Sequence, residues 1–328
     1  MESRGTVKAI VVHEAGGPEM LTLEEVADPT PRAGDLLVEV EAAGLNFIDT
    51  YQRSGLYPLD FPFTPGLEGA GSVAAVGEGV TGFSVGDRVG WVSTLGTYAE
   101  QHLVPAERAI PIPEKLDNDV VAAVLLQGLT AHYLANDTFP LKEGDRCLIH
   151  AAAGGVGLLL TQIADMKGAT VITTVGTGEK AELSRAAGAD EVINYREVDF
   201  KEAVEQSIGA HSLDVVFDGV GAATFDRGLD LLRPRGMMVT FGNASGPVPE
   251  ISPLILAQKG SLFLTRPTMA HYIQTREELL GRANELFELI SAGRLDVRIG
   301  HEYPLERATD AHRALEGRQT TGKVLIHP

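Results

Sequence analysis

The chain has 328 residues, of which 45 are acidic and 27 basic, so its formal net charge at pH 7 is −18. This negative excess argues against nucleic acid or an anionic membrane as the main partner, because phosphate binding needs a basic face. A single cysteine excludes an intramolecular disulfide and a cysteine-rich zinc module. The sequence shows no charged leader followed by an apolar run, and no apolar stretch approaches about 18 residues. These features predict a soluble cytoplasmic protein.

Short apolar or alternating runs fill the first part of the chain. Glycine, proline or aspartate closes each run, and turn signals recur roughly every ten residues. The runs read KAIVVHEAG, LLVEVEAAG, GAGSVAAVGEGV and GDRVGWV. This spacing predicts a compact β-rich domain of the barrel or sandwich type. A helical apolar stretch follows at residues 120–133.

From Asp145 onward, predicted strands alternate with predicted helices. Repeated βα units of this length imply a parallel sheet with right-handed crossovers. The sequence therefore predicts a doubly wound α/β domain of the Rossmann type. Strands are expected at 146–150, 170–175, 191–194, 213–218 and 236–241, and helices at 155–167, at 179–187, from Phe200 and from Ala222.

The last part of the chain resumes the first pattern. A late strand is expected at residues 261–265 and a long amphipathic helix at 275–291, before short strands and a short helix. The α/β domain therefore interrupts the β-rich one. We predict a β-rich catalytic and substrate domain from residues 1–128 and 268–328, and a dinucleotide-binding domain from residues 129–267.

A glycine-rich turn joins the first predicted strand of the α/β domain to its first helix. Gly154 and Gly157 occupy the second and third positions of a G-x-G-x-x-G motif, and Ala152 replaces the first glycine. Small residues are needed there because backbone N–H groups at the helix N-terminus must approach a pyrophosphate. The alternative is a tight turn without a ligand. The strand before, the helix after and the further βα units favour a dinucleotide.

The end of the second strand indicates which dinucleotide binds. An NAD site usually has Asp or Glu there, bonded to the ribose 2′-hydroxyl. This chain has no acid in that segment, and Thr177 and Lys180 follow it. These side chains can supply a donor and a positive charge to a 2′-phosphate. Lys180 alone could equally be a solvated helix lysine, but the missing acid favours NADPH.

Further motifs are Asn46-Phe-Ile-Asp-Thr-Tyr51, Pro65-Gly-Leu-Glu-Gly-Ala-Gly71, Gly96-Thr-Tyr-Ala-Glu100, Gly128-Leu-Thr-Ala131, Ala151–Gly157, Val192-Ile-Asn-Tyr195, Phe241-Gly-Asn243, Thr265-Arg-Pro267 and Arg318. With these motifs, the whole chain resembles the zinc-free quinone oxidoreductases, the zeta-crystallin-like branch of the medium-chain dehydrogenase/reductase superfamily. The resemblance implies a two-domain protomer and commonly a homodimer joined through the cofactor-domain sheets, near residues 261–265. That stretch is apolar, and an exposed edge strand there would be protected by a partner.

Departures from the zinc-dependent members argue against a metal. Their motif is Gly-His-Glu-x-x-Gly, and Leu67 here takes the place of the ligand. The single cysteine, Cys147, falls in the first strand of the cofactor domain, where a buried structural thiol is expected. None of the nine histidines forms a close ligand pair. His150 borders the glycine turn, where packing or a backbone hydrogen bond is expected. The sequence therefore predicts neither catalytic nor structural zinc.

Without a metal, the acceptor of the hydride must already be electrophilic and conjugated. The nicotinamide would supply the hydride, and the protein would hold it against the acceptor in a dry cleft. We therefore expect an NADPH:quinone oxidoreductase. The alternative is an NADPH-dependent enone, alkenal or enoyl-thioester double-bond reductase, and a third possibility is dinucleotide binding without turnover. The residues do not decide between one- and two-electron transfer.

The resemblance also implies catalytic residues. Asn46, Asp49 and Tyr51 would line the cleft against the nicotinamide, so Asn46 is also a cofactor contact. Tyr51, alone or with Asn46, would donate a hydrogen bond to the acceptor oxygen. Asp49 would orient its neighbours or the nicotinamide ribose. The alternatives are a turn-forming Asn-x-x-Asp and a partly buried tyrosine. Tyr57 and Arg266 would form the wall of the substrate cavity.

Further residues are implied as cofactor contacts. Tyr195 could equally be a packing residue, Arg318 could be a solvated arginine, and Phe241 is safer as a backbone contact. Arg318 requires the C-terminal segment to fold back over the cofactor domain. The pyrophosphate set is Ala152, Ala153, Gly154, Gly155, Val156 and Gly157; the 2′-phosphate and adenine set is Val175, Gly176, Thr177, Lys180, Tyr195 and Arg318; the ribose and nicotinamide set is Thr130, Val220, Phe241, Gly242, Asn243 and Thr268.

Overall fold

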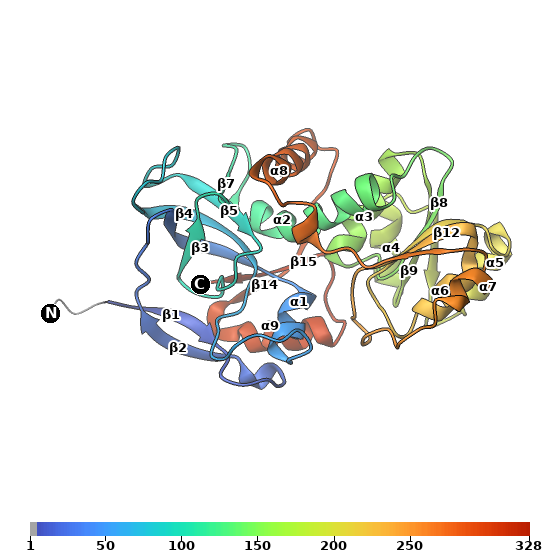
Figure 1. The fold of residues 1–328 in the computed structure, drawn as a ribbon, viewed down its shortest axis with the longest axis horizontal. Coiled ribbons are helices and arrows are strands. Elements are labelled where there is room, and N and C mark those ends of the chain that lie inside the picture. The colour runs from blue at the N-terminus through green and yellow to red at the C-terminus, as the bar shows by residue number, and fades with distance from the viewer. Residues whose placement is uncertain (1–4) are drawn as a thin grey trace. The chain divides into compact units, whose positions relative to one another are not determined.

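The computed structural model describes residues 5–328, which form two compact units (Figure 1). Unit 1 comprises Met1–Leu126 and Ile273–Pro328, and unit 2 comprises Gln127–Tyr272. The sequence placed the two boundaries at 128/129 and 267/268. The first boundary falls within helix α2 (Asn118–Tyr133), which continues into a π-helical turn, η2 (Leu134–Thr138). Among the described residues, no helix combines the length and the apolar character that crossing a membrane requires.

Unit 2 is built on a sheet of six strands, and every pair of neighbours is parallel. Their spatial order is β10-β9-β8-β11-β12-β13, so the chain reverses its direction of winding between β8 and β11. This is the Rossmann order, and it confirms the predicted fold class. The strands are β8 (Arg146–Ile149), β9 (Thr170–Val175), β10 (Glu191–Asn194), β11 (Leu213–Asp218), β12 (Leu232–Thr240) and β13 (Phe263–Thr265).

The helices of unit 2 connect these strands. Apolar residues from both layers form a core that includes Ile172, Val216 and Phe225. The sequence predicted a helix from Ala222, but the helix begins at Phe225 because the Asp218 carboxylate organises residues 219–224 as a turn. The helices are α3 (Gly155–Met166), α4 (Gly178–Ala186), α5 (Phe200–Ile208), α6 (Phe225–Leu231), α7 (Leu254–Gln258) and the 3-10 turn η3 (Met269–His271).

Unit 1 holds the β-rich part of the chain, as predicted. Its main sheet has the order β14-β15-β3-β4-β5-β7, and β6 pairs with the first half of β3. A separate hairpin pairs β1 (Thr6–Val11) with β2 (Thr22–Ala27). Trp91 and Tyr98 are fully buried in the hydrophobic core of unit 1. The strands of the main sheet are β3 (Asp35–Leu45), β4 (Glu68–Val76), β5 (Arg88–Val92), β6 (Gln101–Pro105), β7 (Ile110–Pro111), β14 (Ile299–Pro304) and β15 (Lys323–His327).

The helices of unit 1 come from distant parts of the chain. The first, α1, is only seven residues long, and five of them are buried. A helix this short is not stable alone in water, so its neighbours must hold it in place. The helical elements are η1 (Pro18–Met20), α1 (Phe47–Arg53), α8 (Arg276–Ser291), η4 (Leu305–Arg307) and α9 (Ala308–Glu316).

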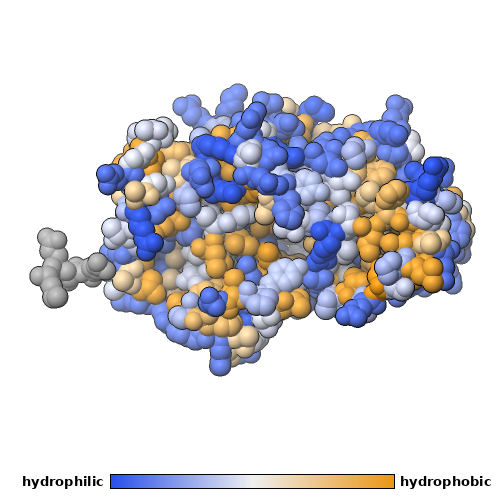
Figure 2. Space-filling view, in the orientation of Figure 1, coloured by the Kyte–Doolittle hydropathy of each residue, from blue (hydrophilic) through white to orange (hydrophobic). Residues whose placement is uncertain are grey.

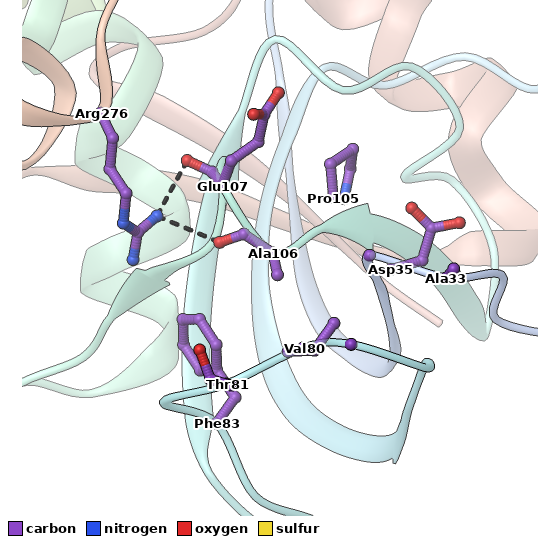
Figure 3. A pocket seen from close by; sticks show the side chains of 11 residues that line it. Ala33, Asp35, Val80, Thr81, Phe83, Pro105, Ala106, Glu107 and Arg276 are labelled. Carbon is purple, nitrogen blue, oxygen red and sulfur yellow. Dashed lines mark hydrogen bonds between the residues drawn. The ribbon is translucent and has the colours of Figure 1, made fainter.

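Unit 1 also has a pocket of about 490 Å³ among its loops (Figure 3). Arg276 borders the pocket, and its Nη1 donates to the carbonyl oxygens of Ala106 and Glu107 at 3.0 and 2.8 Å. The same guanidinium lies 5.9 Å from the ring centroid of Phe83. The cation therefore fastens the start of α8 to the loop after β6, and the pocket contains none of the predicted site residues.

Candidate active site

The turn after β8 leads directly into α3 and is held by its own backbone. The N–H of Gly154 donates to the carbonyl of Ala151 at 3.0 Å, and the N–H of Ala152 donates to that of Thr174 at 3.1 Å. Gly154 is the N-cap of α3, with an extended backbone. The first amides of a helix lack partners within it and carry the positive end of its dipole. This turn can therefore bind an anionic group.

Two glycines of this turn are needed for different reasons. A Cβ on Gly157 would lie 2.5 Å from the carbonyl oxygen of Ala151, so α3 can pack against the turn only with glycine there. A Cβ on Gly154 would meet only that oxygen, at 3.3 Å. Packing within the protein does not explain Gly154, whereas close approach of a pyrophosphate to the backbone does. The turn thus fits the predicted dinucleotide. The other residues predicted to contact the pyrophosphate lie in the same turn and the first turn of α3: Ala152, Ala153, Gly155 and Val156.

His150, at the start of the turn, is 2% exposed. Its ring packs edge-on against Phe200 with 5.0 Å between centroids. Its Nδ1 lies 2.8 Å from the hydroxyl oxygen of Thr174, so the hydrogen bond is to a side chain rather than to the backbone. Burial lowers the pKa of His150, which favours the neutral ring. We infer that His150 joins β8 to β9 beneath the turn.

The end of β9 carries no carboxylate. Gly176 and Thr177 follow the strand, and the Thr177 hydroxyl accepts the N–H of Lys180 at 3.3 Å, which caps α4. The N–H of Tyr195 donates to the carbonyl of Val175 at 3.0 Å. A Cβ on Gly176 would lie 2.6 Å from the hydroxyl oxygen of Tyr195. Glycine therefore lets the tyrosine lie against the end of the strand.

Sequence reasoning missed a second basic residue at this position. A Cβ on Gly176 would lie 3.5 Å from Nε of Arg196, so this guanidinium also reaches the end of β9. Arg196 directly follows Tyr195, but an exposed arginine in a turn forms no recognisable pattern. The segments after β9 and β10 therefore contribute two basic residues, Lys180 and Arg196.

Asp218 holds the turns after β11 and β12, the first through its buried carboxylate and the second through its backbone carbonyl. Its carboxylate accepts the N–H groups of Val220 and Gly221 at 2.7 and 3.0 Å and the Thr224 hydroxyl at 2.9 Å. The N–H of Phe241 donates to the Asp218 carbonyl at 2.8 Å. Both turns are thereby fixed at the same edge of the sheet.

Close backbone approach continues into the turn after β12. A Cβ on Gly242 would collide with the backbone of Gly219, and the half-buried ring of Phe241 lies over that same glycine. Nη1 of Arg266 donates to the Thr240 hydroxyl at 3.1 Å and to the carbonyl of Gly242 at 3.0 Å. The guanidinium predicted for the cavity wall thus reaches the carboxyl end of the parallel sheet.

Two other predicted contacts lie elsewhere in unit 2. Thr130 is 8% exposed on α2 and hydrogen-bonds through its side chain to Tyr133. Thr268 is exposed and precedes η3. The remaining predicted residues follow the carboxyl ends of neighbouring strands, where ligands of doubly wound sheets bind. Those not yet placed are Val175 at the end of β9 and Asn243 after β12.

In unit 1, α1 begins at a buried polar network. The Asp49 carboxylate reaches back to accept the N–H of Asn46 at 2.8 Å, which caps the helix, and it also accepts the hydroxyl of Tyr98 at 3.0 Å. The other carboxylate oxygen of Asp49 is buried without a hydrogen-bond partner. Burial raises the pKa of Asp49 to about 7, although both hydrogen bonds lower it.

The same network contains a buried ion pair. The Lys323 ammonium contacts the carboxylate of Glu68, and it donates to Oδ1 of Asn46 at 3.1 Å. Nδ2 of Asn46 donates to Glu68 at 2.6 Å and to the carbonyl of Gly44 at 3.1 Å. The amide of Asn46 is therefore oriented entirely by protein groups. Burial lowers the pKa of Lys323, and the Glu68 carboxylate opposes this effect.

Tyr51 lies further along α1, among aromatic rings. Its ring is 5.3 Å from that of Tyr57 in an edge-on contact and 6.2 Å from that of Phe47. The N–H of Tyr57 donates to the Tyr51 carbonyl at 3.0 Å, which folds the following loop back onto the helix. The rings of Tyr51 and Tyr57 thus lie together.

Arg53 fixes the other end of α1. It is 1% exposed, it pairs with Glu316 of α9 at 2.7 Å, and its Nη1 lies 3.1 Å from Nδ1 of His312. Arg318, predicted to reach the cofactor, is an exposed residue of unit 1 just after α9. Its φ of +57° is uncommon for a residue with a side chain.

Two family models match this chain. One, described as "Zinc-binding dehydrogenase", matches residues 187–326, and the other, "Alcohol dehydrogenase GroES-like domain", matches residues 32–114. The quinone oxidoreductase 1 of Escherichia coli is 46% identical over an alignment of 323 positions that covers 97% of this chain and 99% of that relative. The chain belongs to the quinone oxidoreductase family.

Two further similarities bear on the chemistry of this family member. The crystal structure of the E. coli quinone oxidoreductase complexed with NADPH has a TM-score of 0.96, at 45% identity, and covers 98% of this chain and 100% of its own. A 2-haloacrylate reductase from Burkholderia is 43% identical over an alignment of 330 positions that covers 98% of this chain and 99% of that relative. Similarity therefore extends to two kinds of reductase.

The zinc ion suggested by one family model does not fit this family member. Leu67 offers no ligand atom, and the adjacent Glu68 carboxylate is occupied by the Lys323 ammonium. Cys147 is fully buried within β8 of unit 2, and burial raises its pKa, which disfavours the thiolate that a metal needs. The donor set of a catalytic zinc site is therefore not assembled around Glu68.

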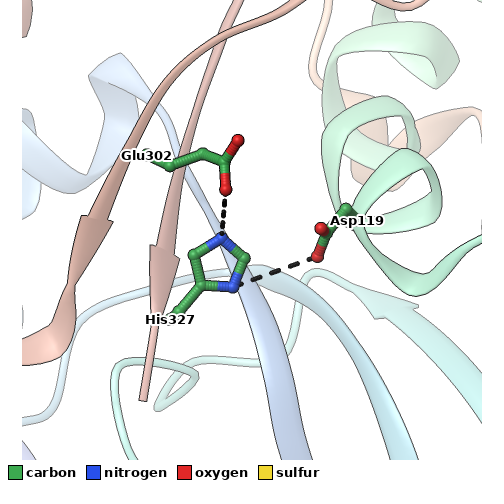
Figure 4. A group of neighbouring side chains, drawn as sticks. All are labelled: Asp119, Glu302 and His327. Atoms are coloured by element: carbon green, nitrogen blue, oxygen red, sulfur yellow. Dashed lines mark hydrogen bonds and ion pairs between the residues drawn. The ribbon is translucent and has the colours of Figure 1, made fainter.

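One group of potential ligands stands together within the part of the chain that the structure describes: Asp119, Glu302 and His327 (Figure 4). His327 lies between the carboxylates, with Nε2 at 3.1 Å from Glu302 and Nδ1 at 3.9 Å from Asp119. Nδ1 also lies 3.0 Å from the carbonyl oxygen of Glu41. The ring thus lies between two carboxylates, and each of its nitrogens already lies within hydrogen-bond distance of a protein oxygen.

Proposed function

We propose that this protein is an NADPH-dependent quinone reductase that works without zinc. The observation that carries the proposal is the carboxyl edge of the unit 2 sheet, where a glycine turn that fits a pyrophosphate adjoins a β9 end with no carboxylate. Lys180 and Arg196 supply positive charge for a 2′-phosphate there. The similar E. coli quinone oxidoreductase, crystallised with NADPH, supports this assignment.

Unit 1 supplies the groups that act on the acceptor. When bound, NADPH supplies the hydride that, with one proton, reduces a quinone to a hydroquinone. Tyr51 donates a hydrogen bond to the acceptor oxygen, which stabilises the negative charge that develops on it. Both Nδ2 protons of Asn46 are committed to Glu68 and Gly44, so Asn46 orients α1 rather than contacting the acceptor. Tyr57, whose ring packs against that of Tyr51, also faces the acceptor in this proposal.

A second candidate function is reduction of a conjugated carbon–carbon double bond. The 43% identity to a 2-haloacrylate reductase favours it, since such an acceptor is also an electron-poor conjugated system. The same cofactor and a metal-free site serve both reactions, because in each case conjugation delocalises the developing charge. The acceptor alone distinguishes the two.

We also propose a homodimer joined through β13. This strand is the last of its sheet, and its Phe263 and Leu264 are 56% and 36% exposed. Leu254 of α7 is 62% exposed. Figure 2 shows an apolar patch over the part of unit 2 where Figure 1 draws α6, α7 and the end of the sheet. An apolar edge strand of this kind pairs readily with a second copy.

The cytoplasm is the location that we propose. Cys147 is the only cysteine of the chain, and its thiol is free and fully buried. A chain without disulfides suits a reducing compartment. The supply of reduced nicotinamide cofactor in that compartment also suits the proposed reaction.

Anaerobic oxidation of NADPH, and separately of NADH, by the chelator-treated protein tests the proposal. The acceptors are 1,4-benzoquinone, 9,10-phenanthrenequinone, a 2-alkenal and 2-chloroacrylate. We expect NADPH-selective turnover of a quinone. Turnover of the alkenal or chloroacrylate alone would move the protein to the double-bond reductases. NADPH binding without turnover of any acceptor would contradict both functions.

A further inference from the structure

The buried ion pair of unit 1 lies in the motif where zinc-dependent relatives keep a metal ligand. Glu68 directly follows Leu67, and its carboxylate accepts the Lys323 ammonium, Nδ2 of Asn46 at 2.6 Å and the backbone N–H of Leu126 at 2.6 Å. Glu68 and Lys323 are 0% and 1% exposed. In this chain the Lys323 ammonium, a cation of the protein itself, therefore lies against the glutamate of the motif.

Stability alone gives little reason for such a pair. Removing two charges from water is costly, and an apolar pair of similar volume often stabilises a fold equally well or better. The surrounding chain nevertheless makes room for it. A Cβ on Gly44 would lie 2.5 Å from the Glu68 carboxylate and 2.6 Å from Cε of Lys323. We infer that the pair is kept for what it orients.

The group that it orients is the residue at the start of α1. Lys323 donates to Oδ1 of Asn46, while Glu68 and the Gly44 carbonyl take both protons of Nδ2. Swapping the amide oxygen and nitrogen would place a donor against the ammonium, so only one orientation of Asn46 is allowed. The backbone N–H of Asn46 donates to the Asp49 carboxylate, and this hydrogen bond caps the helix.

We propose that Lys323 is a positioning residue for the reaction, which acts through Asn46 to set the first turn of α1 and hence the place of Tyr51. This inference rests on the proposed function, in which Tyr51 contacts the acceptor. Lys323 belongs to β15, which pairs with the end of β3 just before Asn46. The sheet thus delivers the ammonium from a strand 277 residues away in the chain.

Two variants separate positioning from stability. Lys323→Met leaves the Glu68 charge buried and unpaired, and should lower the melting temperature. Lys323→Met combined with Glu68→Gln removes both charges, and the amide oxygen introduced at position 68 can still accept the N–H of Leu126. We expect this double variant to regain most of the lost melting temperature, because no unpaired charge remains. Its kcat for quinone reduction should stay at least tenfold below that of the wild type.

Two further measurements on the double variant are the affinity for NADPH and the amide hydrogen exchange of α1. The Kd for NADPH should be unchanged, because the glycine turn, Lys180 and Arg196 lie in unit 2. Amide hydrogen exchange, in contrast, should quicken at residues 46–53. Ile110→Ala, a buried substitution in β7, is the control, and it should lower the melting temperature with kcat within twofold of the wild type.

A double variant with restored melting temperature and wild-type kcat would overturn the positioning role. Absence of turnover in the wild type would instead remove the proposed function. In that case hydrogen exchange still decides, because unchanged exchange at residues 46–53 in the double variant contradicts the inference.

Discussion

Asp49 and Tyr51 are two residues apart on α1, so their side chains leave the helix in different directions. The Asp49 carboxylate turns inward, to the N–H of Asn46 and the hydroxyl of Tyr98. The Tyr51 ring meets Tyr57 and Phe47 instead. The sequence suggested both as cleft residues with different roles, but it could not predict the partner of Asp49, because Tyr98 lies 49 positions away in the chain.

Tyr51→Phe removes one hydroxyl and keeps the ring contacts. We expect kcat with benzoquinone to fall about tenfold or more, since a hydrogen bond to a developing charge is worth roughly 1.5–3 kcal/mol. The KM for NADPH should change less than twofold. Steady-state kinetics at saturating NADPH measures both effects. Unchanged turnover would remove Tyr51 from the mechanism.

Asp49→Asn tests the raised pKa of Asp49, which is about 7 in the folded state and 3.8 ordinarily. Between these values the folded state holds a proton that the unfolded state releases, so stability falls as pH rises from about 4 to 7. The cost is absent below this window and constant above it. The introduced amide does not titrate, so the variant should gain stability over the wild type by a few kcal/mol, in order of magnitude, from pH 4 to 8. Urea unfolding at both pH values measures this. Parallel pH profiles would contradict the shift.

Lys180→Ala and Arg196→Ala test the 2′-phosphate site. Each should weaken NADPH binding by about tenfold or more, because a charge-assisted hydrogen bond is lost, while NADH binding stays unchanged. Fluorescence titration with both dinucleotides measures the difference. Arg185→Ala is the control, since Arg185 is an exposed cation on the same helix that pairs with Glu182. Equal losses for NADPH and NADH would exclude these residues from phosphate binding.

At the scale of elements, the strands and helices of unit 2 were largely predictable. Their alternation, the glycine turn and the missing acid after β9 are all local patterns. Gly157 shows why. A Cβ there would collide with backbone atoms of Ala151 and Ala152, which are only a few positions away in the chain. The start of α6 was mispredicted because one carboxylate, Asp218, takes over the N–H groups ahead of the helix.

Phe263→Glu tests the proposed dimer at the β13 edge. A charge in the middle of an apolar interface would be buried without a partner, so the variant should be monomeric. Light scattering coupled to size-exclusion chromatography reports the mass directly. Val198→Glu, at another position of unit 2 that is 51% exposed, should leave the mass unchanged. A monomeric wild type, or a dimeric Phe263→Glu, would contradict the proposal.

At the scale of the whole molecule, the chain combines a dehydrogenase fold with a motif that cannot take the metal. Leu67 and the Glu68–Lys323 pair leave no open ligand set there. We therefore expect prolonged dialysis against a zinc chelator to change kcat by less than twofold and the melting temperature by less than a degree. Elemental analysis of the dialysed protein is the control. Lost activity that added zinc restores would contradict this expectation.

The fold class of unit 1 was predictable from the sequence, but its buried polar network was not. Alternating apolar runs indicated its strands, and leucine in place of a histidine indicated that the metal is lost. The ion pair that occupies the motif was not readable, because a lysine near the end of a short strand usually faces solvent. Its partners, Glu68 and Asn46, lie 255 and 277 residues away.

The route of the chain also affects its synthesis. Unit 2 is one continuous segment, so all six of its strands have been made by residue 272. Unit 1 begins first but lacks β14 and β15 until the last thirty or so residues are made, and until then Glu68 has no cation beside it. On a ribosome, unit 2 can thus complete its sheet while unit 1, for which we propose the contacts to the acceptor, is still incomplete. If the proposed function holds, the cofactor site can therefore form before the acceptor site does.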